Sequence, residues 1–285
     1  MSRDPTWTGE GITVPPVRIG PLGWVRVALR GGALVVLTFG CLAILLLVRL
    51  VERPLHGLNR PWTPHIVQFV SRNAFRIFGI GYKQHGARME EPGAVVANHS
   101  SWLDIFALNA GKRVYFVAKA EVANWPAIGL AARSIGTVFI RRSAQDAGKQ
   151  RKVLEDRLII GHKLLFFPEG TSTDGLRVLA FKPTLFAAFF ADSLRDLIWV
   201  QPATVIYRAP SGKTARFYGW WGDMDFGRHL LNTLAAPKHG SVEVYWHQPL
   251  RVSDFADRKA IAIASEKAVR GPFEDPATAP LKDES

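Results

Sequence analysis

Apolar residues gather into one long run near the start of the chain and into a series of short runs after residue 90. The long run covers residues 31–48 and carries no charge over eighteen positions, which as a helix gives ~27 Å. That length is at the lower limit for crossing a bilayer. Arg49 and Glu52 follow the run directly, where a secretory signal would have a small-residue cleavage site. The pattern therefore predicts a helix that anchors the chain in a membrane.

The flanks of this run do not fix how the helix sits in the membrane. Three arginines precede the run and three follow it: Arg18, Arg26, Arg30, Arg49, Arg53 and Arg60. Because the positive-inside rule depends on a difference between the two flanks, it gives no orientation here. Equal flanks are awkward for a helix that crosses once and easier for one that enters a single leaflet and returns.

Residues 61–80 support the second arrangement. They place an apolar face opposite polar residues at helical spacing, which is typical of a helix lying at a membrane surface. An ordinary helix of the protein core would show the same pattern, and both interpretations stay open. The apolar face consists of Ile66, Val67, Phe69, Val70, Ala74, Phe75 and Phe78, with Gln68, Arg72, Asn73 and Arg76 off it.

Beyond residue 90, short apolar runs alternate with helical patterns, which predicts an α/β fold with a mainly parallel sheet flanked by helices. Strands are predicted at residues 94–97, 114–118, 137–140, 164–167, 199–206, 216–220 and 242–246, and helices at 102–109, 144–160 and 254–270. The chain would then divide into an irregular tail at 1–28, membrane-anchoring helices at 29–82, an α/β domain at 83–270 and a polar, disordered tail at 271–285.

Composition narrows the classes of partner. The 285 residues carry a formal net charge of +12, which indicates nucleic acid, an anionic lipid surface or an acidic substrate as partner. The sequence has no run of five basic residues and no nucleic-acid-binding module, so nucleic acid is not expected. Cys41 is the single cysteine, which excludes a disulfide framework or a cysteine-rich metal site and fits a reducing compartment.

Three polar turns follow predicted strands, the position where α/β sheets place their active sites. The first contains Asn98, His99, Ser100 and Asp104. Ser101 would cap the next helix and put Asp104 at its third position, where the carboxylate can reach the loop histidine. That carboxylate would fix the imidazole tautomer while His99 takes a proton from a hydroxyl nucleophile. Taken alone, this turn is more typical of a structural histidine and a capping aspartate.

The second polar cluster, which comprises the ends of two strands, and the third cluster carry groups that suit an anionic or polar substrate. Lys119 and Glu121 follow one strand, and Arg141 and Arg142 follow another, where guanidinium groups could bind phosphate or carboxylate through two hydrogen bonds. A solvated strand end would also account for two arginines. The third turn runs from residue 166 to 175 and holds Pro168, Glu169, Gly170, Thr171, Ser172 and Asp174.

Taken in order, these turns resemble the motifs of the glycerolipid acyltransferase family, which includes the 1-acylglycerol-3-phosphate acyltransferases. His99 and Asp104 match its first motif, a histidine and an aspartate with four residues between them. Residues 136–142 match the second, Gly-x-x-Phe-Ile-Arg-Arg, and residues 167–171 match the third, Phe-Pro-Glu-Gly-Thr. Residues 200–203 match the fourth, an apolar run with a central proline. The resemblance covers about residues 85–220.

The resemblance implies the glycerolipid acyltransferase fold and transfer of a fatty acyl group to the hydroxyl of a lysolipid. The donor would be a thioester of acyl carrier protein or coenzyme A, with no metal and no further cofactor. His99 would be the general base and Asp104 would orient it. Substrate would be bound by Asn98, Ser100, Lys119, Arg141, Arg142, Pro168, Glu169, Gly170, Thr171, Ser172 and Asp174. Such an enzyme would contact membrane lipids of the bacterial inner membrane, with the catalytic domain on the cytoplasmic face.

The chain departs from the family pattern at Ser172. Members that take a phosphate-bearing acceptor usually have arginine there. The version Glu-Gly-Thr-Ser-Thr-Asp-Gly at residues 169–175 looks like the bacterial branch that acylates lyso-ornithine lipid, which has an amino-acid head group and no phosphate. Asp174 could then face the ammonium group of the acceptor. A 1-acylglycerol-3-phosphate acyltransferase is the alternative, because Arg141 and Arg142 could still hold a phosphate.

Two other classes of function compete with an acyltransferase. A serine hydrolase of the Gly-x-Ser-x-Gly type would need that nucleophile motif, and the sequence does not contain it. A non-catalytic, basic membrane-binding protein would account for the charge and the apolar helix. It would leave the three polar turns unexplained.

Overall fold

The computed structural model describes residues 6–12, 18–125, 127–141 and 146–280. The strands are β1 (Gly81–His85), β2 (Gly93–Ala97), β3 (Tyr115–Lys119), β4 (Val138–Ile140), β5 (Leu164–Phe166), β6 (Trp199–Arg208), β7 (Ser241–Trp246) and β8 (Leu250–Arg251). The α-helices are α1 (Pro21–His56), α2 (Thr63–Phe78), α3 (Asp104–Gly111), α4 (Ile128–Ser134), α5 (Ala147–Ile159), α6 (Phe226–Ala235) and α7 (Arg258–Glu274). Short 3₁₀ segments are η1 (Ala120–Asn124), η2 (Pro183–Phe190) and η3 (Val252–Asp254).

The strands form a sheet in the order β1-β7-β6-β2-β5-β3-β4, with β8 paired to β6. From β6 to β4 along this order, neighbouring strands are parallel, as β1 is to β7. Strand β6 runs antiparallel to β7 and β8. The prediction of a mainly parallel α/β sheet is therefore confirmed.

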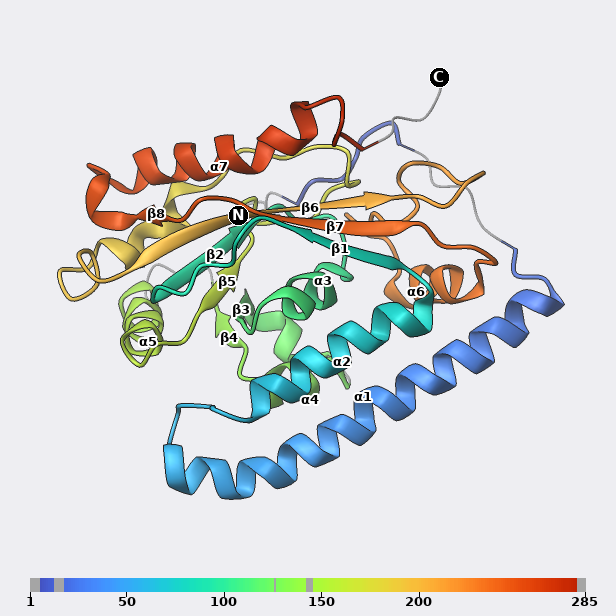
Figure 1. Ribbon diagram of the computed structural model, residues 1–285, viewed down its shortest axis with the longest axis horizontal. Coiled ribbons are helices and arrows are strands. Elements are labelled where there is room, and N and C mark those ends of the chain that lie inside the picture. The colour runs from blue at the N-terminus through green and yellow to red at the C-terminus, as the bar shows by residue number, and fades with distance from the viewer. Residues whose placement is uncertain (1–5, 13–17, 126, 142–145, 281–285) are drawn as a thin grey trace.

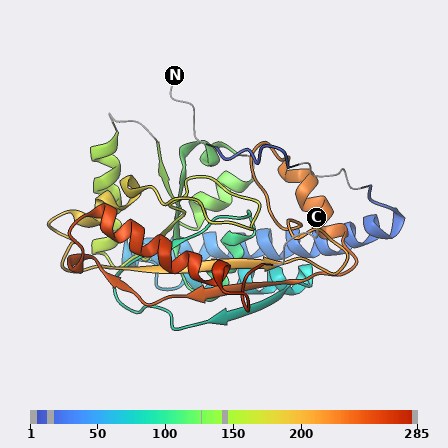
Figure 2. The same cartoon turned by 90° about the horizontal axis from the view of Figure 1, so that it is seen from above.

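Helices cover both faces of this sheet (Figures 1 and 2). On one face, α2, α3 and α6 contribute Phe75, Leu108 and Leu234 to an apolar core. On the other, η2 and α7 contribute Phe186 and Ile261 to a second core. Strands β2 and β5 are buried along their whole length, which explains why their sequences are almost uninterrupted apolar runs.

The strand prediction at residues 216–220 is wrong. The backbone N–H of Gly219 donates to the carbonyl of Arg216 (2.8 Å), which closes a turn, and that of Trp220 donates to the carbonyl of Ser100 (2.8 Å). The segment is thus attached through its backbone to the loop after β2, while the Tyr218 ring contacts Tyr207 and His239. In contrast, the edge strand β1 has no apolar pattern to predict it, because four of its five residues are exposed.

Helix α1 begins at Pro21, so residues 21–28 belong to it and not to an irregular tail. It is long and apolar enough to cross a membrane, and it lies alongside α2 and α6 (Figure 1). Only 11% of its apolar window is buried, which means that a narrow stripe around Leu42 and Leu45 packs on the protein. The exposed remainder includes Leu22, Leu29, Val36, Leu46, Leu47, Leu50 and Leu55.

Helix α2 combines both interpretations of residues 61–80. It packs Ala74, Phe75 and Phe78 into the core beside α3, as a core helix would. Phe69, from the same predicted apolar face, is exposed. The buried stripe of α2 thus connects the outer helix α1 to the domain.

The prediction of a disordered tail from residue 271 is wrong for the described residues. Helix α7 continues to Glu274. The guanidinium of Arg208 then donates to the carbonyls of Thr278 (3.1 Å) and Ala279 (3.3 Å), and the Thr278 hydroxyl donates to the carbonyl of Pro272 (2.8 Å). These bonds attach residues 275–280 to the end of β6.

Glu52 joins α1 to α2. Its side chain is fully buried, and Oε1 accepts from the backbone N–H groups of Trp62 (2.7 Å) and Thr63 (3.0 Å) at the start of α2. Oε2 accepts from the Thr63 hydroxyl (2.8 Å) and from Arg49 (2.9 Å). A carboxylate that satisfies free N–H groups at a helix N-terminus also interacts well with the helix dipole. Glu52 therefore fixes the angle at which the two helices meet.

Replacing Glu52 by alanine should destabilise the protein by about 3 kcal/mol, because Arg49 and the three other donors lose a buried acceptor. The measurement is the midpoint of thermal unfolding of the purified protein in detergent. Glu274→Ala, a loss of the same charge at an exposed helix end, serves as the control. Equal midpoints for the two variants would contradict this role of Glu52.

Candidate active site

His99 and Asp104 meet at the carboxyl end of β2. The His99 Nδ1 atom lies 2.7 Å from Asp104 Oδ2, and the two side chains are 21% and 0% exposed. Asp104 also accepts from the backbone N–H groups of Ser100 (2.8 Å) and Ser101 (3.0 Å) and from the Tyr207 hydroxyl (2.8 Å). Four hydrogen bonds stabilise the negative charge of this buried carboxylate. The expected pairing of His99 with Asp104 is present.

The expected cap of the following helix is different. Helix α3 begins at Asp104 itself, and Ser101 does not cap it. The Ser101 hydroxyl is buried without a partner among the described residues. No side chain caps α3. The Asp104 carboxylate instead accepts from the backbone N–H groups of Ser100 and Ser101 in the loop before the helix, which would otherwise be unsatisfied.

Phe167 stacks on one face of the His99 ring. The two rings stack with centroids 4.0 Å apart and planes 9° apart. Phe167 follows β5, which pairs in parallel with β2, so the loops after the two strands meet at one edge of the sheet. With Nδ1 committed to Asp104, the Nε2 atom has no hydrogen-bond partner among the described residues and is the atom that can take up a proton.

Asn98 and Ser100 lie in the protein interior and hold the loop. The Asn98 amide donates to the carbonyl of Val205 (2.9 Å) and accepts from its N–H (2.7 Å), which continues the pairing of β2 with β6. Asn98 also donates to the Ser100 hydroxyl (3.3 Å). Both side chains are fully buried, so their role is to position His99, in place of the predicted contact with substrate.

Glu169 ties the loop after β5 to His99. Its Oε1 accepts from the backbone N–H of His99 (2.7 Å) and its Oε2 from that of Leu179 (2.7 Å), and the residue is 1% exposed. Burial raises the pKa of Glu169 to about 8, against the lowering effect of the two backbone hydrogen bonds and with a smaller raising effect from Asp104. The predicted contact of Glu169 with acceptor gives way to a positioning role.

Asp174 does not face an open site. Its carboxylate is 0% exposed and pairs with Arg177 through two bonds (3.0 and 2.9 Å) and with Arg216 (3.1 Å). Oδ1 also accepts from the backbone N–H of Leu176 (3.2 Å). Because its charge is engaged by two arginines, the hypothesis that it faces the acceptor's ammonium group is wrong.

The remaining predicted residues are spread along the same edge of the sheet. Lys119 ends β3 and lies opposite Ile140 of β4, so Arg141 follows next to it. Arg142 lies outside the described residues. The Pro168 carbonyl accepts from the N–H of Lys182 (2.9 Å), Gly170 adopts a positive φ of 73°, and Ser172 is half-buried.

Other residues at the site have no signal in the sequence patterns. Trp7, in the predicted irregular tail, donates its backbone N–H to the Thr171 hydroxyl (3.2 Å), and its ring lies 5.1 Å from the guanidinium of Arg177. Tyr207 is an apolar strand position by its pattern, and only the fold brings its hydroxyl to Asp104. Phe167 belongs to a matched motif, yet its stacking on His99 requires the parallel pairing of β2 with β5.

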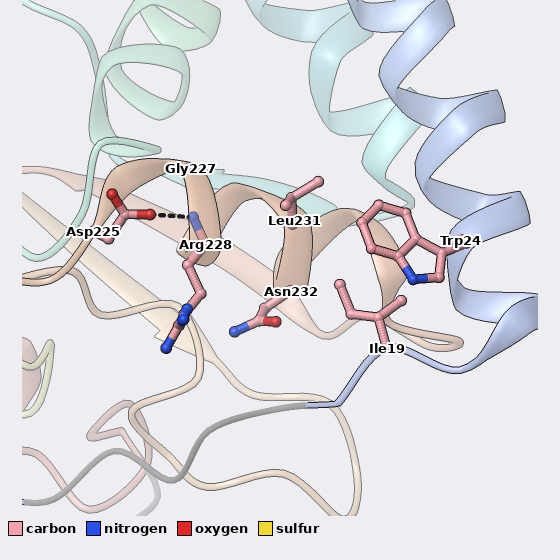
Figure 3. Close-up of a pocket in the computed structure, with 7 residues that line it drawn as sticks. All are labelled: Ile19, Trp24, Asp225, Gly227, Arg228, Leu231 and Asn232. Atoms are coloured by element: carbon pink, nitrogen blue, oxygen red, sulfur yellow. Dashed lines mark hydrogen bonds between the residues drawn. The ribbon is translucent and has the colours of Figure 1, made fainter.

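A separate hollow of about 440 Å³ lies between the start of α1 and α6 (Figure 3). It is lined by residues such as Trp24, Arg228 and Leu231, and none of its lining residues belongs to the loops around His99. Among the described residues, no group of three His, Cys, Asp or Glu side chains is placed to bind a metal ion.

Residues 80–207, which hold the loops after β2 and β5, match the family model described as Acyltransferase. A lyso-ornithine lipid O-acyltransferase from Rhodobacter capsulatus is 54% identical to this chain, over 95% of this chain and 97% of its own length. The chain belongs to this acyltransferase family. The resemblance drawn from the sequence motifs is thereby confirmed.

Two further comparisons concern acyltransferases that are less similar to this chain. A 1-acyl-sn-glycerol-3-phosphate acyltransferase from Neisseria gonorrhoeae is 38% identical, over 41% of this chain and 47% of its own length. The crystal structure of the 1-acyl-sn-glycerophosphate acyltransferase from Thermotoga maritima has a TM-score of 0.59 at 18% identity and covers 87% of this chain and 94% of its own. This structure shares the fold. The long apolar surface of α1 associates the acyltransferase with a membrane.

The geometry suits a general base for acyl transfer. Asp104 holds the proton on Nδ1 of His99, which leaves the lone pair on Nε2 to accept a proton from a hydroxyl nucleophile. As the imidazole becomes positively charged, the buried carboxylate stabilises that charge at a distance of 2.7 Å. Phe167 restricts rotation of the ring, so the base is oriented before a substrate binds.

The raised pKa of Glu169 makes stability depend on pH in a defined direction. The folded protein keeps this proton up to about pH 8, whereas the unfolded chain loses it near the ordinary glutamate pKa of 4.5. The contribution is therefore complete below about pH 4.5 and is lost as the pH rises towards about 8. Between these values the thermal midpoint of the wild type should fall relative to that of Glu169→Gln.

The measurement is thermal unfolding of both proteins in detergent at a series of pH values. Glu121→Gln, at an exposed position, is the control and should follow the wild type at every pH. A midpoint difference between wild type and Glu169→Gln that stays constant from pH 5 to 8 would show that Glu169 does not titrate in this range.

Proposed function

We propose that this acyltransferase transfers a fatty acyl group from an acyl thioester to the hydroxyl of lyso-ornithine lipid. The observation that carries the proposal is the His99 ring, oriented by Asp104 and Phe167 with Nε2 open. Nε2 takes the proton of the acceptor hydroxyl as its oxygen attacks the thioester carbonyl. The tetrahedral intermediate then expels the thiolate, which receives the proton from His99 and leaves as the thiol.

The choice of acceptor rests on the loop after β5 and on the Rhodobacter capsulatus relative, whose name states lyso-ornithine lipid as its substrate. Ornithine joined through its α-amino group to a 3-hydroxyacyl chain keeps a free carboxylate. Arg177 is placed to bind it. Its Nε and Nη2 are fixed by Asp174 and its plane by Trp7, its side chain is 46% exposed, and its Nη1 makes no hydrogen bond among the described residues.

Arg177 is tied to the catalytic loop through Thr173. The backbone N–H of Thr173 donates to the carbonyl of His99 (2.9 Å), and its hydroxyl lies within hydrogen-bond distance of the Arg177 carbonyl (3.4 Å). A pre-oriented guanidinium suits a carboxylate, which accepts two parallel hydrogen bonds. The acceptor's charge recognised here is thus negative, the reverse of the role expected for Asp174.

The second candidate is a 1-acylglycerol-3-phosphate acyltransferase. The partial match to the Neisseria gonorrhoeae relative favours it, as does the placing of Lys119 beside Arg141 at the same sheet edge. The donor in either case is a thioester of acyl carrier protein or coenzyme A, with no metal or further cofactor. We place the enzyme at the cytoplasmic face of the bacterial inner membrane, with α1 lying in one leaflet so that its exposed leucines contact lipid.

The direct test offers purified enzyme lyso-ornithine lipid and lysophosphatidate in parallel, with acyl carrier protein and coenzyme A thioesters as donors. We expect clear preference for lyso-ornithine lipid, and His99→Ala should lower turnover by about 10²–10⁴-fold, the usual contribution of a general base. His99→Ala should remain folded at the assay temperature and keep its binding to vesicles. Preference for lysophosphatidate would favour the second candidate, and unchanged turnover in His99→Ala would remove the mechanism.

Arg177→Gln tests recognition of the carboxylate. The variant should raise KM for lyso-ornithine lipid by about tenfold, as expected for the loss of one charge-assisted hydrogen-bonded contact, with little change in KM for the donor. The comparison variant is Arg177→Lys, which keeps the positive charge but lacks the paired N–H donors of a guanidinium group. It should restore only part of the affinity. Equal KM values for the acceptor in wild type and Arg177→Gln would show that the carboxylate binds elsewhere.

A further inference from the structure

The end of α1, the turn that follows it and α4 enclose a groove of about 710 Å³ that the acyl-transfer site does not use. Its apolar lining includes Leu46, Leu47, Leu50 and Leu58, all of them exposed. Helix α4 contacts α1 here (Figure 1). Since three of these leucines belong to the exposed apolar surface of α1, the groove opens on the surface that faces lipid.

Four arginines line the same groove: Arg49, Arg53, Arg60 and Arg133. Arg49 pairs with Glu52. Arg60 donates to the carbonyl of Ser134 (2.6 Å) and Arg133 to that of Ala123 (2.5 Å), bonds that place the guanidinium groups without neutralising them. Among the described residues, no carboxylate forms a salt bridge with Arg53, Arg60 or Arg133.

The positive charges of this cluster influence one another. Burial, and next to it the charges of Arg49 and Arg53, lower the pKa of Arg60. Like charges that the fold holds close together repel one another, and this repulsion raises the energy of the folded protein. A bound anion would reduce the repulsion. A guanidinium group also matches the oxygens of a phosphate with two hydrogen bonds.

We propose that this arginine-lined groove binds one anionic phospholipid of the surrounding membrane. The phosphate contacts Arg53, Arg60 and Arg133, and an acyl chain lies along the leucines of α1. A phospholipid satisfies both halves of the groove, since a soluble anion would leave the leucines exposed to water and a zwitterionic lipid would leave the net charge unbalanced. An acidic carrier protein would meet the arginines but would not fill an apolar groove.

The test compares Arg53→Gln/Arg133→Gln with a matched variant, Arg151→Gln/Arg258→Gln, which removes the same charge from exposed positions on α5 and α7. Full-length proteins are mixed with vesicles of phosphatidylcholine, with and without phosphatidylglycerol. The first variant should bind phosphatidylglycerol vesicles about tenfold or more weakly than wild type, because each arginine near an anionic surface contributes about fivefold. The matched variant and binding to pure phosphatidylcholine should change little.

A second measurement separates a site from general attraction to the surface. Short-chain phosphatidylglycerol and glycerol phosphate are titrated into the protein in detergent, and native mass spectrometry counts bound molecules. Wild type should retain one phosphatidylglycerol and bind glycerol phosphate far more weakly, and the Arg53→Gln/Arg133→Gln variant should retain none. Where that variant proves unstable, Arg53→Glu replaces it, because the Arg53 side chain makes no hydrogen bond among the described residues.

Several outcomes would overturn the proposal. One is an equal loss of vesicle binding in both double variants, which would indicate general charge attraction. Another is glycerol phosphate binding as tightly as the lipid. A third is unchanged lipid binding with a raised KM for acyl carrier protein thioesters, which would make the groove a docking surface for an acidic protein. Turnover with a coenzyme A thioester in detergent reports that each variant is folded.

Discussion

The site depends on the buried carboxylate of Asp104. A fully buried negative charge is costly unless donors surround it, and here four donors converge on its two oxygens. To supply them, the loop after β2 must turn its Ser100 and Ser101 N–H groups inwards and α3 must begin at Asp104. The strand β6 must bring up Tyr207 from the other side. Once these requirements are met, the remaining donor is Nδ1 of His99, and the ring has a single orientation.

Hydrogen bonds also fix the backbone around His99. Its N–H is held by Glu169 and its carbonyl by Thr173, and the carbonyl of Ser100 is held by Trp220. Glu169 and Thr173 belong to the loop after β5, and Trp220 belongs to the segment between β6 and α6. The position of His99 is therefore determined by the sheet that brings these segments together and not by the local turn alone. Glu169 can bind the His99 N–H while buried away from water, because a protonated carboxyl still accepts both backbone hydrogen bonds. The neutral form also does not repel the Asp104 carboxylate.

Sequence reasoning succeeded where a pattern reports a local property. Buried parallel strands are apolar runs, and the histidine and aspartate of the first turn are close in sequence and in space. It failed where contacts between residues far apart in the sequence determine the structure. Asp174 was assigned to an ammonium group because no local feature shows that Arg177 and Arg216 already pair with it. Residues 216–220 have the composition of a strand, but their backbone forms a turn and bonds to the carbonyl of Ser100 in the loop after β2.

A continuous series of contacts connects the apolar surface to the base. Glu52 in α1 fixes the start of α2, α2 packs its buried stripe beside α3, and the first residue of α3 is Asp104. A lysolipid acceptor keeps its acyl chain in the membrane, so its hydroxyl is available only near the bilayer surface. If a flexible segment connected the active site to the membrane, the distance between the active site and the bilayer surface would vary from one turnover to the next. In the proposed mechanism, a site joined through packed helices to the apolar helix α1 holds Nε2 of His99 at a constant depth, which lowers the entropic cost of bringing the acceptor hydroxyl to His99.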